Sequence, residues 1–309
     1  MTSREALRPE SRAVSMTPNR FRAISERSKD AWNRHPHRFL ATWYRSGFLH
    51  PFYNPQARFI RERIQSQLAA MHRGIPFNFE MNLLRPFSIL YWGHVDRIRA
   101  RVPFLQDAFM ALCRMAGALR WWRIRMCYPK SVRKLSLLDL GCGSGNSYES
   151  FRSFGLHHFL EYVGIDIAEK NIENCKALYP KGTFAVGDIM DTGFPECAFD
   201  TVLVSHVFEH LHPQVLPFAL REAWRVARRQ VIFNFFCEED TDRHRIIPKD
   251  GLYYWNCLSR KRIKKTLGIS DDAIEITDSY WGRRWKRISF LGYPVSCSTW
   301  VMTKRPASL

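Results

Sequence analysis

Short apolar runs alternate with helical patterns along residues 135–240. A short continuous apolar run is typical of a strand buried on both faces, whereas apolar residues spaced three or four apart indicate an amphipathic helix. Their alternation predicts βαβ units, and therefore a parallel sheet with helices on both faces. The predicted strands are 135–140, 162–167, 183–186, 200–205 and 230–237, and the predicted helices are 145–155, 168–179 and 213–228.

The segments outside this alternating region give a coarse domain plan. Residues 273–281 and 296–304 are predicted to pair as an antiparallel hairpin at the sheet edge. Residues 1–35 are polar, basic and without periodicity, which predicts a disordered tail. A helical accessory region is predicted over 36–130, because apolar residues follow helical spacing within 55–71 and 105–123. The sheet domain is predicted over 131–309.

No apolar stretch reaches the roughly 18 residues that a membrane-spanning helix needs, and the N-terminus lacks the apolar block of a secretory signal. The eight cysteines form no C-x-x-C pair, so neither a zinc ribbon nor a redox motif is indicated. We therefore predict reduced thiols in a cytoplasmic protein.

Charge is distributed unevenly along the chain. Residues 1–134 carry 25 Lys and Arg against 8 Asp and Glu, residues 135–240 carry 8 against 15, and residues 241–309 carry 14 against 6. The net charges are therefore +17, −7 and +8. An acidic middle between basic flanks suggests that the middle is one functional unit and that the flanks meet something anionic.

The first predicted strand ends in a glycine-rich turn that opens a helix. The turn has the spacing G-x-G-x-G, formed by Gly141, Gly143 and Gly145. Glycines allow positive φ and let a ligand approach the main chain, and the start of a helix presents free N–H groups. A dinucleotide fingerprint would instead have the spacing G-x-G-x-x-G. Asp139, two positions before the first glycine, would repel a pyrophosphate but attract a sulfonium or ammonium cation.

Polar residues also follow the next strands. Asp166 ends the second, where an acid can accept hydrogen bonds from both hydroxyls of a ribose. Asp188 and Ile189 follow the third, and a carboxylate there can reach the exocyclic amine of adenine while the isoleucine packs on the ring. An aspartate at a strand end is also a good helix N-cap, and for any single one of them that alternative has equal weight.

On these motifs, the sequence resembles the class I S-adenosylmethionine-dependent methyltransferases, in the broad group that acts on small molecules. The resemblance covers about 135–237, with a weaker match to 304. It implies a doubly wound, mostly parallel, seven-stranded Rossmann-like α/β sheet with an antiparallel edge strand. It also implies S-adenosylmethionine as cofactor, bound by Asp139, Gly141, Gly143, Gly145, Asp166, Ile167, Asp188, Ile189 and Ser205.

The segment after the fourth strand, His206-Val207-Phe208-Glu209-His210, offers candidates for a catalytic base. The carboxyl ends of parallel strands line the crevice of such sheets, and an imidazole titrates close enough to neutrality to serve a hydroxyl or phenol acceptor. We therefore predict His206, Glu209 and His210 as catalytic residues. Equal weight rests on the alternative that the last two only shape the pocket wall.

The same segment matches the zinc-protease pattern H-x-x-E-H, and Glu209, His210 and His212 could hold a divalent ion. The preceding strand and the cofactor motifs argue against the zinc protease. A divalent ion that assists a methyltransferase is the more plausible of the two alternatives, but our predicted site includes no metal.

The basic, aromatic flanks suit nucleic acid or an anionic lipid surface, although an ordinary helical cap with a solvated arginine face is the commoner alternative. Two classes of methyl acceptor follow. One is a small or lipid-linked metabolite that receives the methyl group on oxygen or carbon, with the flanks meeting an anionic membrane surface as a peripheral protein. The other is RNA. The chain lacks the N/D-P-P-F/Y tetrapeptide and the Pro-Cys nucleophile of base methylation, which favours the metabolite. A cofactor-binding scaffold without catalysis is the third class.

Overall fold

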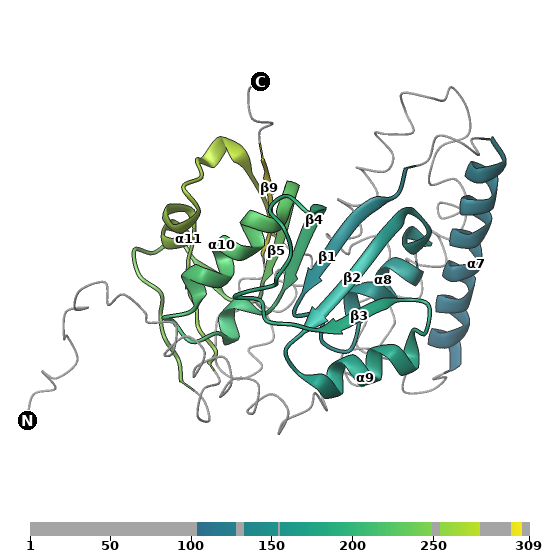
Figure 1. Cartoon of the computed structure of the whole chain (residues 1–309), viewed down its shortest axis with the longest axis horizontal. Coiled ribbons are helices and arrows are strands. Elements are labelled where there is room, and N and C mark those ends of the chain that lie inside the picture. The colour runs from purple at the N-terminus through teal and green to yellow at the C-terminus, as the bar shows by residue number, and fades with distance from the viewer. Residues whose placement is uncertain (1–103, 128–132, 154, 249–253, 279–297, 305–309) are drawn as a thin grey trace, which may run out of the picture.

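A computed structural model of the chain describes residues 104–127, 133–153, 155–248, 254–278 and 298–304 (Figure 1). The predicted helix at 55–71, the predicted tail at 1–35 and most of the predicted accessory region lie outside these ranges. No helix within them combines the length and hydrophobicity that a membrane-spanning segment needs.

A seven-stranded sheet with the order β3-β2-β1-β4-β5-β9-β8 forms the centre of the described chain (Figure 1). The first five strands in chain order are mutually parallel, and β9 runs antiparallel to both of its neighbours. The predicted seven-stranded α/β sheet and its terminal hairpin are confirmed, and the antiparallel strand lies one place inside the edge. The strands are β1 Leu135–Leu140, β2 Leu160–Asp166, β3 Thr183–Val186, β4 Phe199–Ser205, β5 Ala227–Phe235, β8 Ile274–Asp278 and β9 Ser298–Thr303.

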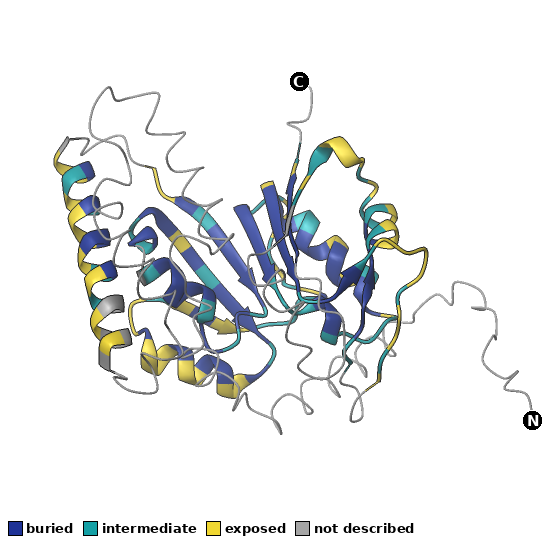
Figure 2. Cartoon of the chain, turned by 180° about the vertical axis from the view of Figure 1, so that it is seen from behind, coloured by how far each residue is buried: buried dark blue, intermediate teal, exposed yellow. Residues whose placement is uncertain are grey.

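One face of the sheet is covered by three helices, α7 (Phe104–Cys127), α8 (Asn146–Ser153) and α9 (Glu169–Leu178). The helix predicted at 105–123 is thus confirmed as α7. Its inner face packs on α8 and on the 3₁₀ helix η1 (Leu156–Phe159), where the Trp121 ring meets the Phe159 ring edge-on at 4.8 Å. A Cβ on Gly155 would lie 2.3 Å from the Cα of Gly117, so the two backbones touch. The outer face of α7 points away from the domain (Figure 2).

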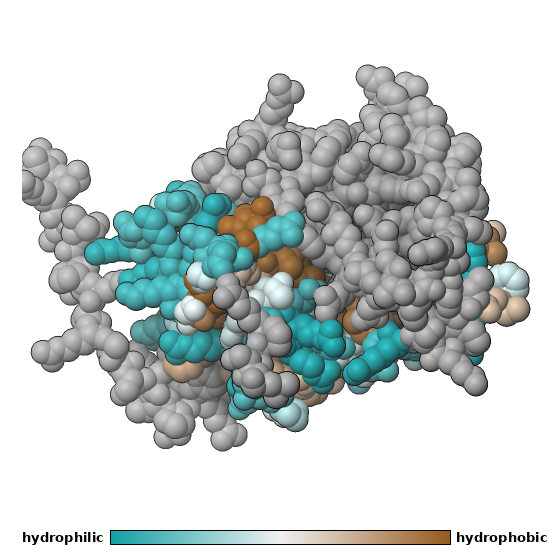
Figure 3. Space-filling view, turned by 90° about the horizontal axis from the view of Figure 1, so that it is seen from above, coloured by the Kyte–Doolittle hydropathy of each residue, from teal (hydrophilic) through white to brown (hydrophobic). Residues whose placement is uncertain are grey.

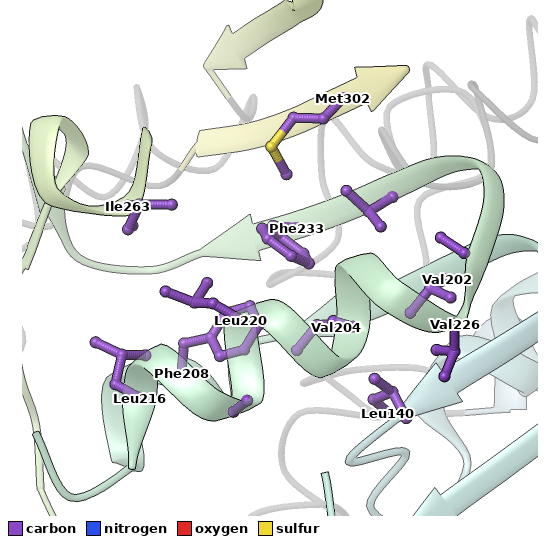
Figure 4. Packing of buried hydrophobic residues seen from close by; sticks show 14 of the residues in the cluster. Leu140, Val202, Val204, Phe208, Leu216, Leu220, Val226, Phe233, Ile263 and Met302 are labelled. Atoms are coloured by element: carbon purple, nitrogen blue, oxygen red, sulfur yellow. The ribbon is translucent and has the colours of Figure 1, made fainter. Parts of the chain in front are cut away.

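The opposite face of the sheet carries α10 (Leu216–Val226) and α11 (Arg260–Leu267). Alternate residues of one strand serve the two faces: Leu137 belongs to the core under α7–α9, whereas Leu138 and Leu140 belong to the core under α10 and α11. The outer surface of α11 is strongly hydrophilic (Figure 3). Figure 4 shows the packing beneath it, where Phe233 of β5 lies among side chains from α10, α11 and β9.

A two-stranded parallel ladder, β6 (Glu238–Glu239) with β7 (Leu258–Ser259), joins the end of β5 to the start of α11. Ser259 caps α11 by accepting a hydrogen bond from the Arg262 N–H at 3.1 Å. The Arg260 guanidinium donates two hydrogen bonds, at 2.6 and 2.7 Å, to the Glu238 carboxylate. These contacts and the ladder hold the two ends of this connection, at β6 and β7, beside each other at the start of α11. The remaining short elements are the 3₁₀ helices η2 (Phe208–His210) and η3 (Asp271–Ala273).

Candidate functional site

The glycine-rich turn has the left-handed backbone that its sequence predicts. Gly141, Gly143 and Gly145 have φ of +71°, +55° and +86°. A Cβ on Gly141 would lie 2.5 Å from Val207 Cγ2, and one on Gly145 would lie 2.7 Å from Tyr179 Cε2, so both are also packed too tightly for a side chain. A Cβ on Gly143 would meet nothing within 4 Å among the described residues. The tip of the turn therefore borders open space in front of the first turn of α8.

Asp139 stands in β1, two residues before this turn, and is 1% exposed. The Tyr162 hydroxyl donates a hydrogen bond to Asp139 Oδ2 at 2.6 Å, and no donor in the described part of the chain reaches Oδ1. Burial raises the pKa of this carboxyl to about 7, although the hydroxyl groups of Tyr162 and Ser147 oppose the rise. A buried carboxylate oxygen without a donor is unfavourable by about 1–3 kcal/mol, so the site favours a ligand that brings a cation or an N–H donor.

Asp166 connects the tip of the turn to α9. Its Oδ2 accepts a hydrogen bond from the Gly143 N–H at 2.9 Å, and its Oδ1 accepts from the Ala168 N–H at 2.9 Å and from Asn171 Nδ2 at 3.1 Å. Asp166 thus ties the turn to the residues at the start of α9, but the N-cap of this helix is Ala168, so Asp166 is not the helix cap that the alternative interpretation of the sequence expected.

The predicted adenine residues follow β3. The Asp188 carboxylate accepts a hydrogen bond from the Met190 N–H at 2.8 Å, which closes a tight turn. Ile189 and Ile167 are both partly buried, and Ile189 packs on the core under α10. The Gly187 N–H donates to the Asp166 carbonyl at 3.0 Å, so the ends of β2 and β3 lie side by side. The predicted ribose and adenine positions are therefore adjacent.

Ser205 ends β4 and belongs to a polar chain that the sequence analysis missed. Asn234 of β5 donates from Nδ2 to Ser205 Oγ at 3.3 Å, and its Oδ1 accepts from the Thr299 hydroxyl of β9 at 2.7 Å. Asn234 and Thr299 are both buried. The signal that could have revealed Asn234 is its amide side chain inside the apolar run 230–237.

His206 follows Ser205 with φ +56°, which is unusual for a residue with a side chain. Its N–H donates to the Asn234 carbonyl at 2.9 Å, which holds this backbone in place. Burial, and secondarily the neighbouring His210, lowers the pKa of His206 to about 4. The imidazole is therefore uncharged at neutral pH and is a weak base.

Glu209 is completely buried in η2. Its Oε1 accepts hydrogen bonds from the Phe236 N–H at 2.6 Å and the Cys237 N–H at 3.4 Å. Its Oε2 has no partner within the described ranges, and burial raises the pKa of the carboxyl to about 8. These contacts tie η2 to the end of β5, so Glu209 stabilises the wall of the site, and its predicted role as a catalytic residue stays a prediction.

His210 and its neighbours form an aromatic wall at the carboxyl ends of β4 and β5. The Phe236 ring lies 5.1 Å from the His210 ring and 6.1 Å from the Trp255 ring, and the rings of Tyr254 and His212 are 5.3 Å apart. His210 Nδ1 lies 2.9 Å from the Tyr254 carbonyl, which can only accept, so Nδ1 carries the hydrogen. In neutral His210, Nε2 is therefore the basic nitrogen.

The fully buried Asn256 holds this wall together, which the sequence analysis also missed. Its N–H donates to the Glu209 carbonyl and its Nδ2 to the Leu211 carbonyl, both at 2.9 Å. Its Oδ1 accepts from the Ile247 N–H at 3.2 Å. The segment after β6 is thereby fixed against η2. Among the described residues, no group of three or more His, Cys, Asp or Glu side chains could hold a metal ion.

Comparison with known proteins decides the family. Residues 138–235 match the family model described as "Methyltransferase domain". The chain contains a class I S-adenosylmethionine-dependent methyltransferase domain. The match begins within β1 and ends at the last residue of β5, so it spans the glycine turn, Asp166, Asp188 and the wall at η2.

Relatives of the methyltransferase domain are distant. Ajmaline N-methyltransferase of Rauvolfia serpentina is 33% identical over 102 residues, which cover 30% of this chain and 32% of that protein. The chain thus matches about a third of the length of this curated relative. Among solved structures, an S-adenosylmethionine-dependent methyltransferase from Mesorhizobium loti is 14% identical, with a TM-score of 0.41 over 60% of this chain and 97% of that one. Another from Archaeoglobus fulgidus is 18% identical, with a TM-score of 0.39 over 61% and 94%.

The family implies S-adenosylmethionine as methyl donor, and the residues of the methyltransferase domain fit it. The open space at Gly143 provides room for a ligand at the tip of the turn, and the donorless Oδ1 of Asp139 suits a cofactor that carries positive charge.

Replacing Asp139 by Asn tests this electrostatic fit. We expect about tenfold weaker S-adenosylmethionine binding, because the neutral amide loses a charge-assisted contact. Wild-type affinity falls as the pH drops below about 7, because the cation binds the ionised form of a carboxyl whose pKa is raised to about 7. Calorimetric titrations between about pH 5 and 8 should show this slope in the wild type and in the control Asp240→Asn, an exposed position. A slope that persists in Asp139→Asn contradicts the assignment.

Proposed function

We propose that the chain is an S-adenosylmethionine-dependent methyltransferase that methylates oxygen or carbon of a small or lipid-linked metabolite. The observation that carries the proposal is the pairing of open space at Gly143 with the buried, donorless Asp139 oxygen. We further propose that Asp166 and Ile167 contact the ribose, that Asp188 and Ile189 contact the adenine, and that Ser205 borders the reacting methyl group. The proposed location is cytoplasmic.

Bound S-adenosylmethionine supplies an electrophilic methyl group whose leaving group is a neutral thioether. The chain's own residues then have two tasks, to orient the acceptor and to exclude water. The turn, the Asp166 bridge to α9 and the Asn234 chain make one side of the site rigid. Holding two reactants in line in this way can contribute on the order of 7–11 kcal/mol.

The aromatic wall supports a metabolite acceptor. Phe236, Tyr254 and Trp255 offer ring faces and edges on which an apolar or aromatic acceptor can pack. Ajmaline N-methyltransferase, the distant relative, is named for a small-molecule acceptor. Both observations favour a metabolite over RNA.

His210 is the strongest candidate base in this proposal. The Tyr254 carbonyl fixes the tautomer that leaves Nε2 unprotonated, whereas burial makes His206 a weak base and Glu209 is bonded to backbone N–H groups. A hydroxyl or phenol acceptor would lose its proton to Nε2. A neutral amine acceptor could attack through its lone pair without a base.

Incubation of a cell extract with S-adenosylmethionine labelled on its methyl group tests the proposal. We expect label to enter the small-molecule or organic-extractable fraction in the presence of the chain. Label in RNA would overturn the acceptor class. Cofactor binding without incorporation of label into any fraction would leave the scaffold interpretation standing and contradict the enzyme.

Once the acceptor is identified, we expect His210→Gln to lower kcat about 100-fold if the acceptor is a hydroxyl. This decrease is within the range of rate losses caused by removal of a general base. Glutamine can still donate to the Tyr254 carbonyl, so S-adenosylmethionine affinity should stay within about twofold. His158→Gln, in η1 where the imidazole stacks on Trp121 of α7 and not in the aromatic wall, is the matched control. An unchanged kcat in His210→Gln contradicts the assigned base and favours an amine acceptor.

A further inference from the structure

The outward face of α7 carries a continuous apolar stripe, which we call the outer stripe. Its residues follow one another at alternating spacings of three and four, which is the repeat that keeps side chains on one side of a helix. Six of the seven are large, with exposed fractions from 39% for Leu105 to 66% for Met126. The outer stripe consists of Leu105, Ala108, Leu112, Met115, Leu119, Trp122 and Met126, all of which are exposed.

The outer stripe is not part of the domain core. Among the described side chains of α7, the core contacts come from the opposite face, through Cys113, Ala116, Trp121 and Ile124, together with the Arg114–Glu149 ion pair at 3.2 Å. Figure 2 shows the exposed residues of α7 along the side that faces away from the sheet. From Leu105 to Met126 the stripe extends about 33 Å at 1.5 Å per residue. An exposed apolar surface of this length indicates an interaction site.

The charges around the outer stripe indicate which partner fits it. Within α7, the last turn adds the exposed Arg125 and the partly buried Arg123 beside Trp122 and Met126. In the sequence, Arg97, Arg99 and Arg101 stand just before the helix, and residues 1–134 carry a net charge of +17. Two copies of this segment would repel each other, whereas an anionic surface would attract it.

We infer that α7 docks the chain on the surface of an anionic lipid bilayer, with the outer stripe inserted among the headgroups and first acyl carbons. Leucine and methionine provide the apolar contact, and Trp122 with Arg123 and Arg125 provides the aromatic and basic groups that suit a bilayer interface. The methyltransferase domain remains outside the lipid, because the inner face of α7 holds it.

Another basic helix shows why charge alone does not make such a surface. Three cations of α11 already have acidic partners, in the pairs Arg260–Glu238, Lys261–Asp242 and Lys264–Asp271. Seen from above, the surface over α11 is hydrophilic, whereas the described residues at the α7 edge include brown and pale ones (Figure 3). The outer stripe combines exposed apolar side chains with neighbouring positive charge, and lipid surfaces bind this combination.

Sedimentation of the full chain with vesicles tests this inference without any assay of methyl transfer. We expect binding to vesicles of phosphatidylcholine with about one third phosphatidylserine, and much weaker binding to phosphatidylcholine alone. Leu119→Glu should weaken partitioning about tenfold or more, because a leucine that would enter the lipid is replaced by a charge. The matched control is Leu178→Glu in α9, which adds the same charge at 56% exposure against 58% for Leu119, and it should bind like the wild type.

Three outcomes overturn the inference. One is a wild-type chain that does not sediment with the anionic vesicles. A second is an equal loss of vesicle binding in Leu119→Glu and Leu178→Glu, which means that the added negative charge alone weakens the binding. The third is a wild-type dimer in light scattering that Leu119→Glu converts to a monomer while vesicle binding stays unchanged, which assigns the outer stripe to a second copy of the chain.

Discussion

Gly143→Arg is expected to abolish measurable S-adenosylmethionine binding while the domain stays folded. The Cβ at this position borders space that no described residue fills within 4 Å, so the new side chain enters the ligand site instead of the core. Two like charges about 4 Å apart repel by about 4 kcal/mol at the effective dielectric of a protein surface, which corresponds to roughly a 1,000-fold loss of affinity. Isothermal titration calorimetry measures the affinity, and circular dichroism verifies the fold.

The matched control is Gly268→Arg. Gly268 ends α11 with φ +64°, and a Cβ there also meets nothing within 4 Å, so the same substitution imposes the same kind of backbone strain away from the turn. We expect both variants to lose about 1–2 kcal/mol of stability, because both force a side chain into the left-handed region. Equal cofactor affinities in the two variants would contradict the placement of the ligand at Gly143.

The second large effect concerns the pH dependence of folding. Burial raises the pKa of Glu209 from 4.5 to about 8, so the folded chain holds a proton that the unfolded chain releases. The stability contributed by this proton is fully present below about pH 4.5 and is lost as the pH rises to about 8. Relative to Glu209→Gln, which cannot ionise, the wild-type chain should lose on the order of 5 kcal/mol over this interval.

Urea unfolding at several pH values measures this difference. Glutamine keeps the acceptor oxygen for the Phe236 N–H, so the variant should match the wild type near the acid end of the interval and become the more stable protein at the alkaline end. Glu173→Gln, on the exposed side of α9, is the control and should follow the wild-type curve. Parallel curves for the wild type and Glu209→Gln would show that Glu209 is ionised in the folded chain.

The sheet could be predicted from the sequence because its central strands are buried on both faces and therefore read as apolar runs. The predicted strand boundaries were wrong where polar residues continue a strand. β5 begins at Ala227, three residues before the predicted start, and the predicted helix extended into it. The difference arises because Arg228 and Arg229 are exposed and pair with Asp200 at 3.1 and 3.4 Å. Pairings of this kind depend on the register between strands, which the pattern of one strand does not contain.

The glycine turn on the cofactor side of the site could also be predicted from local sequence, because its backbone conformation requires Gly141 and Gly143. The hydrogen-bond partner of Asp139 could not, because it depends on the alignment of β1 with β2, which brings Tyr162 opposite Leu137. The acceptor side depends on contacts between distant segments. Glu209 bonds to the main chain 27 residues later, and nothing in H-x-x-E-H indicates it. The sequence therefore identified polar residues near the site, but it did not indicate what each of them contacts.

The three hydrogen bonds of Asp166 have a consequence for the kinetics of the site. One carboxylate holds both the tip of the glycine turn and the start of α9, so the turn has its shape before a ligand arrives. Association then needs no rearrangement of the glycine turn, which favours a fast association rate. Each half of the cofactor also meets a surface that is already formed, so adenosine and methionine should each occupy their own half-site without the other.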